Sequence, residues 1–334
     1  MRKLVVILFS LVLLPGLSSC KKPESPSGQP KKITIAVIPK GSTHEFWKSI
    51  HAGAVKAGRE LKVDIIWKGP LKEDDREAQI KVVEDLISRG ISGMVLAPLD
   101  DTALREPVGN ATRNGIPVVI IDSPLNSEDY VSFVATDNYK GGSMAGEYLC
   151  RLLNGKGKVI MLRCAVGSAS TLERERGWSD AIKKCSDLQV VSDNQYGGVT
   201  TETAFQASEN LLSRLTAPDG SLAIDGIFSS NESTTFGMLR ALQDGGWAGK
   251  VKFVGFDSSS KLVEALKAGQ IDGLILQNPF QMGYLGVKNI VAYLNKQTIE
   301  KRVDTGETLV TKENMNLPEI KELLSPDLKK WLNE

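Results

Sequence analysis

The chain has 334 residues, with 41 Lys and Arg against 40 Asp and Glu, and it carries a formal net charge of +1. A charge balance this close to neutral gives no support for nucleic-acid binding. The length favours two domains over one.

Residues 1–19 have the order of features that marks a secretory signal. Met1-Arg2-Lys3 is basic, residues 4–14 are almost entirely apolar, and small residues precede Cys20. The apolar stretch is short for a membrane-spanning helix, which needs about 20 apolar residues. Leu17-Ser18-Ser19-Cys20 resembles the lipobox of bacterial lipoproteins, and this resemblance implies cleavage before Cys20 and lipidation of that cysteine. An ordinary cleaved signal with a chance cysteine is the alternative.

Residues 20–32 are expected to be a flexible tether that begins at the lipidated cysteine. After Cys20 they hold Pro, Ser, Gly, Gln and Lys and no aliphatic or aromatic side chain, a composition that cannot bury a core. No later apolar run is long enough to cross a membrane. The sequence therefore predicts an exported protein, periplasmic or on the cell surface, that lipid on Cys20 anchors to the membrane.

Three further cysteines follow, at Cys150, Cys164 and Cys185. Their spacings match no zinc pattern, and we predict no metal site and no cofactor. Export permits a disulfide, but an odd number leaves at least one thiol free. We favour three buried, unpaired thiols.

From residue 31 onward the chain alternates short β-rich runs with amphipathic stretches. The first half predicts strands at Ile33 to Ile38, Val63 to Trp67, Gly93 to Ala97, Ile116 to Ile121 and Val131 to Ala135. Between them it predicts helices over Glu45 to Glu60, over Asp74 to Ser88, and from Asp101 onward, with apolar residues spaced for one helix face.

The second half repeats the scheme. Its predicted strands are Val159 to Leu162, Val190 to Ser192, Ile224 to Ser229, Val251 to Val254 and Leu274 to Leu276, and its helices lie near Tyr139, Leu172, Glu202, Ser233, Lys261 and Met282. Near-continuous apolar strands separated by helices indicate parallel sheets covered on both faces. The predicted fold is α/β, with two doubly wound parallel-sheet lobes.

Ligands of such sheets bind beyond the carboxyl ends of the strands. Polar residues in those places occur in both halves, at residues 40–47, 122–123, 137–138, 168–176, 231, 257 and 277. We therefore expect the binding site in the cleft between the lobes.

Four stretches together resemble the type I periplasmic solute-binding proteins of ABC transporters, of the ribose- and galactose-binding kind. They are Ala135-Thr136-Asp137-Asn138 with Gly141-Gly142, Glu173-Arg174-Glu175-Arg176-Gly177, Phe228-Ser229-Ser230-Asn231-Glu232, and Val254-Gly255-Phe256-Asp257. Each is weak alone, but their order and spacing over residues 32–312 make a strong signal. The resemblance implies a binding protein that captures a small sugar and delivers it to a membrane permease.

The resemblance also implies which residues contact the ligand and where the chain crosses between lobes. The ligand positions are Lys40, His44, Phe46, Trp47, Asp122, Ser123, Arg176, Asn231, Asp257 and Gln277, with a further contact near Val199. The hinge residues are Thr136, Asp137, Gln277, Asn278 and Asp304. Residues 33–136 and 278–304 would form the N-terminal lobe, and residues 137–277 and 305–334 the C-terminal lobe, joined by a three-segment hinge.

The chemistry of these residue types suits a sugar. Asp122 and Asp257 can each accept from two hydroxyls, and Arg176 offers a planar fork of donors. Asn231 and Gln277 each supply a donor and an acceptor. Aromatic rings, here Phe46 and Trp47, can cover the flat apolar face of a sugar ring.

Each of these residues also has a purely structural interpretation. Asp122 and Asp257 could cap helices. Arg176 could pair with Glu173 one helical turn earlier. One of the two aromatic residues could belong to the core.

Three positions depart from the ribose-binding pattern, and they argue against ribose itself as the ligand. Ser123 stands in place of an arginine, His44 in place of an asparagine, and Val199 in place of an aromatic residue. We hypothesise that Lys40 partly replaces the missing positive charge beside Ser123. The positive charges of Lys40 and Arg176 balance the negative charges of the two aspartates, so the predicted pocket is near neutral. A neutral pocket favours an uncharged polyol as the ligand.

Other classes of function fit less well. The sequence has no Gly-x-Ser-x-Gly elbow, no phosphate-binding Gly-x-x-x-x-Gly-Lys loop and no His-Glu-x-x-His zinc motif, so we do not expect an enzyme. The related repressors carry a DNA-binding segment where this chain has a signal and tether. We expect a monomer. The open alternative is that a protein of the same fold binds a non-sugar metabolite or signalling molecule and reports to a membrane sensor.

Overall fold

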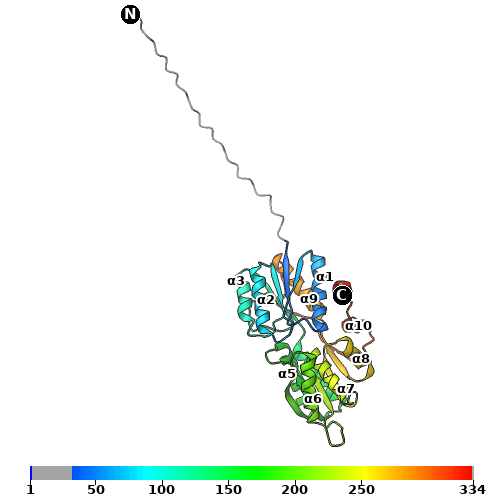
Figure 1. Cartoon of the computed structure of the whole chain (residues 1–334). Coiled ribbons are helices and arrows are strands. Elements are labelled where there is room, and N and C mark those ends of the chain that lie inside the picture. Colours follow the sequence, from blue (N-terminus) through cyan, green and yellow to red (C-terminus); the bar gives the residue numbers. More distant parts are fainter. Residues whose placement is uncertain (2–31, 333–334) are drawn as a thin grey trace. The chain divides into compact units, whose positions relative to one another are not determined.

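The computed structural model describes Met1 and residues 32–332, and its strands form two separate six-stranded sheets (Figure 1). The predicted signal after Met1, Cys20 and all of the tether except Lys32 lie outside the part that can be described. The two sheets confirm the prediction of two doubly wound α/β lobes.

The first sheet is entirely parallel, in the order β11-β5-β4-β3-β1-β2. Its strands are β1 (Thr34–Ile38), β2 (Asp64–Trp67), β3 (Gly93–Leu96), β4 (Val118–Ile121), β5 (Ser132–Ala135) and β11 (Arg302–Asp304). Successive residues of β1 pack into different cores, since Ile35 and Val37 face one side and Ala36 and Ile38 the other. This alternation explains why the strand is apolar throughout.

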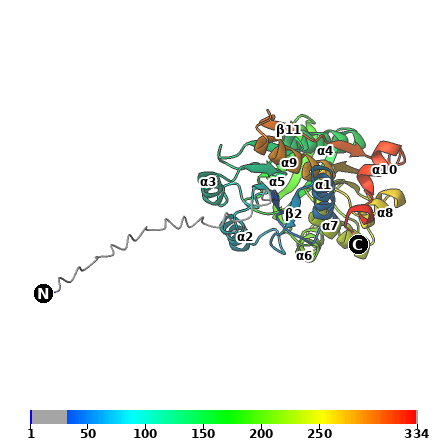
Figure 2. The same ribbon diagram turned by 90° about the horizontal axis from the view of Figure 1, so that it is seen from above.

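Helices cover both faces of the first sheet, as Figure 2 shows from above. On one face lie α1 (Glu45–Leu61) and α9 (Pro279–Leu294), and on the other α2 (Arg76–Ser88) and α3 (Arg105–Arg113). The predicted helix from Asp101 begins later, because residues 101–104 form a turn whose backbone N–H groups are bound by Asp100.

The second sheet has the order β12-β10-β9-β8-β6-β7, and only the edge strand β12 is antiparallel. Its strands are β6 (Lys156–Arg163), β7 (Asp187–Tyr196), β8 (Gly226–Ser229), β9 (Lys252–Phe256), β10 (Gly273–Leu276) and β12 (Thr308–Val310). One face is covered by α4 (Asn138–Leu152) and α5 (Ala169–Lys183), the other by α6 (Thr201–Ser213), α7 (Glu232–Asp244), α8 (Ser260–Ala268) and α10 (Pro318–Leu324). Within residues 32–332 we find no helix with the length and apolar character needed to span a bilayer.

Glycines let α4 and α5 cross in close contact. A Cβ at Gly142 would overlap the carbonyl oxygen of Arg174, and a Cβ at Gly177 would overlap that of Tyr139. Any larger residue at either position would push the helices apart, so this crossing fixes the rotation of α5. That rotation decides which α5 side chains face the first lobe.

The chain passes between the two sheets at the three places where hinge residues are predicted. After β5, Asp137 accepts a hydrogen bond from Lys140 N and caps α4, and after β10, Asn278 caps α9 in the same way through Gln281 N. The third crossing follows β11, where Asp304 accepts from Gly306 N. Bending at these positions stays a prediction.

The C-terminal segment, predicted to belong to the C-terminal lobe over residues 305–334, touches both lobes. Ile320 and Leu324 of α10 pack into the second-lobe core. In contrast, α11 (Lys329–Leu332) lies against α1, and Arg59 Nη2 donates to the carbonyl of Trp331 over 3.0 Å. The lobe boundaries remain predictions.

A disulfide joins Cys150 to Cys185, so the preference for three free thiols is wrong. Cys150 lies near the end of α4 and Cys185 just after α5, and the close crossing of these helices brings the two ends together. Cys164 is free and buried.

Candidate functional site

Asp122 and Asp257 occupy corresponding places in the two lobes. Asp122 directly follows β4 and Asp257 directly follows β9, and both have a positive φ, 63° and 66°. The left-handed region is costly for most side chains, although Asp and Asn tolerate it better than others, and such residues cluster at functional sites. Both aspartates are buried. Each sheet thus ends in a carboxylate that faces the same cavity.

This cavity, which we call the cleft cavity, lies between the lobes and has a free volume of about 30 Å³. Its lining comes from both sheets and consists of Lys40, His44, Phe46, Trp47, Glu73, Asp122, Ser168, Ser170, Thr171, Arg174, Asn231, Glu232, Asp257 and Gln277. Of the ten predicted ligand residues, eight are in this lining. Ser123 is buried and accepts a hydrogen bond from Lys40, which is in the lining.

Lys40 links the two lobes on one side of the cavity. Its ammonium group lies 2.7 Å from Asp122 Oδ2 and donates to Ser123 Oγ, both in the first lobe. It also donates to Ser170 Oγ of α5 over 3.1 Å. The positive charge therefore stands beside Ser123, as the hypothesis about Lys40 requires.

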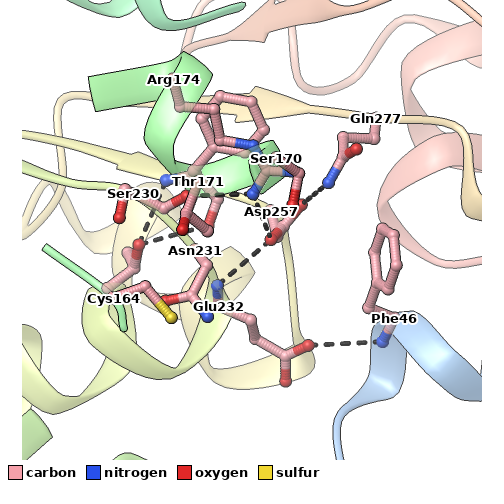
Figure 3. A network of polar contacts seen from close by, with 12 residues as sticks. Phe46, Cys164, Ser170, Thr171, Arg174, Ser230, Asn231, Glu232, Asp257 and Gln277 are labelled. Carbon is pink, nitrogen blue, oxygen red and sulfur yellow. Dashed lines mark hydrogen bonds and ion pairs between the residues drawn. The ribbon is translucent and has the colours of Figure 1, made fainter. Parts of the chain in front are cut away.

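Arg174 and Gln277 hold Asp257 in the second lobe (Figure 3). Arg174 Nη1 is 3.6 Å from Asp257 Oδ2, and Gln277 Nε2 donates to Asp257 Oδ1 over 2.7 Å. The guanidinium also lies 4.0 Å from the centre of the Phe256 ring and bonds Asn138 Oδ1. Burial raises the pKa of Asp257, while Arg174 and Gln277 oppose that rise.

His44 and Glu73 form a second ion pair in the wall of the cavity. His44 Nδ1 is 2.6 Å from Glu73 Oε1, and the same oxygen accepts a hydrogen bond from Trp47 Nε1. Burial lowers the pKa of His44, but the Glu73 carboxylate more than offsets this and the pKa rises to about 9. Burial raises the pKa of Glu73, and His44 overcomes that effect and lowers it to about 2. The pair is therefore ionised at neutral pH.

Glu232 reaches across the cleft to the start of α1. Its carboxylate accepts hydrogen bonds from the backbone N–H groups of Glu45 and Phe46, over 3.4 and 3.3 Å, and Figure 3 shows the bond to Phe46. In return, Glu45 accepts from the backbone and hydroxyl of Ser260 at the start of α8. Anions at helix N-termini are stabilised by the helix dipole. We call these two cross-lobe contacts the glutamate clasp.

The other predicted residues in the cavity serve partly as structure. Asn231 caps α7 through Thr234 N, while its Nδ2 bonds Ser233 Oγ. Trp47 is 2% exposed and packs edge-on against Phe46, with ring centres 5.0 Å apart. Phe46 also lines the cavity at 9% exposure and belongs to the same core cluster. Both aromatic residues thus join the hydrophobic core to the cavity wall.

The structure does not bring Arg176, a predicted ligand residue, into the cavity lining. Its guanidinium is mostly exposed and pairs with Glu173 over 2.7 Å, which is the alternative that the spacing allowed. Arg174, two residues earlier, is the arginine in the cavity. Positions two apart on an α-helix point about 200° apart, so one faces the cleft and the other faces solvent.

Six residues of the cavity lining were not among the predicted ligand residues: Glu73, Ser168, Ser170, Thr171, Arg174 and Glu232. The inward orientation of Arg174 could have been predicted, because Gly177 lies one turn further along the same helix face. A glycine there marks the face of the helix that packs closely against its neighbour. Glu73 opens a run of acidic residues that is typical of a solvated loop, and nothing local marks its pairing with His44. Within residues 32–332 no group of three or more His, Cys, Asp or Glu side chains is placed to hold a metal ion.

Two parallel-sheet lobes joined by three crossings, with buried charged residues lining the cavity between them, define a two-lobed binding protein. The chain belongs to the periplasmic binding protein domain family, whose model matches residues 35–298. The resemblance seen in the sequence is therefore confirmed.

Relatives with known ligands cover nearly the whole chain. The ribose import binding protein RbsB of Haemophilus influenzae is 29% identical over 91% of this chain and 97% of its own length. A carbohydrate transporter solute-binding protein of Agrobacterium radiobacter, solved with D-arabinose, is 33% identical with a TM-score of 0.84, over 89% of this chain and 100% of that one. An ABC transporter solute-binding protein of Agrobacterium vitis, solved with D-fucose, is 36% identical with a TM-score of 0.82, over 87% and 100%.

Proposed function

We propose that this chain captures a small neutral sugar between its lobes and delivers it to an ABC transporter permease. The relatives that it matches over nearly their full length bind ribose, arabinose or fucose, according to their names. They belong to a family of transport proteins and not of enzymes, so the ligand is expected to leave unchanged. The single observation that carries the proposal is the pair of buried aspartates, one from each lobe, facing one cavity.

The charges of the cavity favour a neutral ligand. Lys40 pairs with Asp122, His44 with Glu73, and Arg174 with Asp257. The remaining carboxylate, Glu232, accepts backbone N–H groups of α1. A charged ligand would leave one of these buried groups without compensation, which is costly in a low-dielectric site.

Sugar hydroxyls match the polar groups that these pairs present. We assign the first-lobe contacts to Lys40, Asp122 and Ser123, because an ionised carboxylate can accept two hydroxyl protons. The second-lobe contacts we assign to Arg174, Asn231, Asp257 and Gln277, with Arg174 in place of Arg176. Phe46 supplies an apolar surface for the ring, supported from behind by Trp47 and by the His44–Glu73 pair.

Binding would be coupled to bending at Thr136-Asp137, at Gln277-Asn278 and at Asp304. A ligand that contacts both lobes at once shifts the balance toward the closed arrangement, and only these two-sided contacts can do so. A sugar that binds with a micromolar dissociation constant would have a standard free energy of binding of about −8 kcal/mol. The closed arrangement is then the one that the permease recognises.

We further propose that lipid on Cys20 keeps a monomeric protein at the membrane, beside its permease. A thermal-shift screen of pentoses and hexoses tests the binding function. One or a few sugars should raise the melting temperature in proportion to the logarithm of their concentration. If no neutral sugar shifts it at millimolar concentration, while a charged metabolite does, the proposed function is wrong.

A further inference from the structure

A second chamber adjoins the cleft cavity on the side of the C-terminal segment. Its free volume is about 190 Å³, compared with about 30 Å³ for the cleft cavity. Phe46, Asp257 and Gln277 line both spaces, so the two spaces meet at these side chains. We call this space the side chamber.

The C-terminal segment forms the outer wall of the side chamber, through Leu323, Leu324, Ser325, Pro326 and Leu328. It is fixed at both ends. Leu324 is buried in the second-lobe core. At the other end Trp331 packs on Phe280, with ring centres 6.4 Å apart, and below the guanidinium of Arg59 at 5.5 Å. The wall is therefore held by both lobes.

The lining is apolar on several sides. Leu276, Pro279, Leu323, Pro326 and Leu328 surround the chamber together with the Phe46 ring. Of the polar groups, Glu45 and the hydroxyl of Ser260 already bond each other over 3.1 Å. Ser49, Ser258 and Ser325 add further hydroxyl groups to the lining. Ligand pockets typically combine apolar surface with convergent polar groups, and this chamber offers both.

Gln277 provides a free acceptor at the junction of the two spaces. Its Nε2 is used by Asp257, but its Oε1 is buried and is one of the few side-chain oxygens within residues 32–332 that lack a hydrogen-bond partner. Gln277 is 4% exposed. A buried acceptor without a hydrogen-bond donor lowers the stability of the protein. A ligand that donates a hydrogen bond to this oxygen would therefore bind more tightly.

We infer that the side chamber is a subsite for a compact apolar substituent on the bound sugar, such as the aromatic aglycone of a glycoside. This inference rests on the proposed function, because the sugar ring occupies the cleft cavity between Asp122 and Asp257. The ring would bring a hydroxyl donor to Gln277 Oε1. The substituent would extend past Phe46 toward Leu323 and Leu328, and it would remove apolar surface from water on both sides.

The test compares free sugars with their phenyl glycosides by calorimetry. D-Ribose, D-allose, D-arabinose and D-fucose are titrated first, followed by both phenyl anomers of whichever sugar binds. Leu328→Trp fills the chamber from its wall, and Ser325→Trp fills it from a second position. Leu317→Trp is the matched control, because Leu317 is exposed and lies outside the chamber.

One phenyl anomer should bind at least tenfold more tightly than the free sugar. Leu328→Trp and Ser325→Trp should remove this gain and leave the affinity for the free sugar within about twofold, and Leu317→Trp should preserve both affinities. The inference is overturned if neither phenyl anomer binds more tightly than the free sugar, or if the gain survives both chamber variants. Free sugars that still bind would leave the proposed function standing. If no sugar or glycoside binds, both the proposed function and this inference are wrong.

Discussion

At the scale of single residues, the cavity is a set of buried ion pairs. Each pair costs desolvation that its own attraction and hydrogen bonds must offset, and loss of one partner leaves the other charge buried without compensation. Lys40, His44 and Arg174 each have their carboxylate within 4 Å. The pairs therefore hold polar groups in fixed positions for ligand hydroxyls, at some cost to stability.

The two neighbouring arginines give a matched test of the site. Arg174→Gln should weaken sugar binding about 10- to 100-fold, because a charge-assisted hydrogen bond contributes about 1.5–3 kcal/mol. Arg176→Gln should leave the affinity within twofold, since Arg176 contacts Glu173 and not the cavity. Calorimetry measures the sugar affinity of both variants. Equal losses of affinity would contradict the assignment of Arg174, and not Arg176, to the binding site.

Stability should depend on pH through Glu232. Burial, opposed mainly by His44, raises its pKa to about 7, above the ordinary 4.5. A group whose pKa is raised on folding contributes stability that is full below its unfolded pKa and is lost as pH rises through its folded one. The free energy of unfolding should therefore lose on the order of 2 kcal/mol from this group between pH 4.5 and 7. In Glu232→Gln that part of the decline should disappear.

Urea unfolding at pH 5, 6, 7 and 8 measures this difference. Other buried groups set the background: burial also raises the pKa values of Asp257 and Glu175, and the His44–Glu73 pair contributes in both directions. The raised pKa of His44, about 9, gives stability that is full below pH 6.5 and is lost as pH rises through 9. The lowered pKa of Glu73, about 2, gives stability that is full above 4.5 and is lost as pH falls through 2. If the wild type and Glu232→Gln decline in parallel, the assignment to Glu232 is wrong.

Much of the site could be predicted from residues that directly follow strands, because the topology itself places them at one edge. Asp122, Asn231, Asp257 and Gln277 were found in this way. Arg174 and Arg176 could not be separated by that argument, since the rotation of α5 depends on its crossing with α4. Glu73 was missed because its partner His44 is 29 residues away and joins it only in the folded chain.

At the scale of elements, α4 and α5 form a unit that carries Arg174. Reciprocal glycine contacts bring the helices together, and the disulfide fixes their ends. The alternation of strands and helices was predictable because each long element has its own periodicity. The strands β11 and β12 have only 3 residues each. Segments this short carry too little pattern to be distinguished from a loop.

Removal of the disulfide should lower stability without changing the site chemistry. Cys150→Ser with Cys185→Ser should cost about 2–4 kcal/mol in the free energy of unfolding, because the cross-link restricts the unfolded chain. Thermal unfolding with and without a reducing agent measures it. The reductant should destabilise the wild type and leave the double variant unchanged. An equal response of both would show that the bond does not form in the protein.

At the scale of the whole molecule, several contacts join the lobes in addition to the three crossings. They are the bond from Lys40 to Ser170, the glutamate clasp, and the bond from Arg76 to the carbonyl of Val166. Contacts that exist only when the lobes meet favour the closed arrangement, and a ligand adds to them. Capture of a sugar then depends on both walls at once.

The most direct test of this account compares Asp122→Asn with Asp257→Asn. Asn is suited to the left-handed backbone at both positions, so each variant removes the charge and keeps the conformation. In calorimetry with the sugar that binds the wild type, each single variant should lose at least about 30-fold in affinity while staying folded, because one wall alone cannot hold the ligand. Wild-type affinity in either folded variant would contradict capture between the two aspartates.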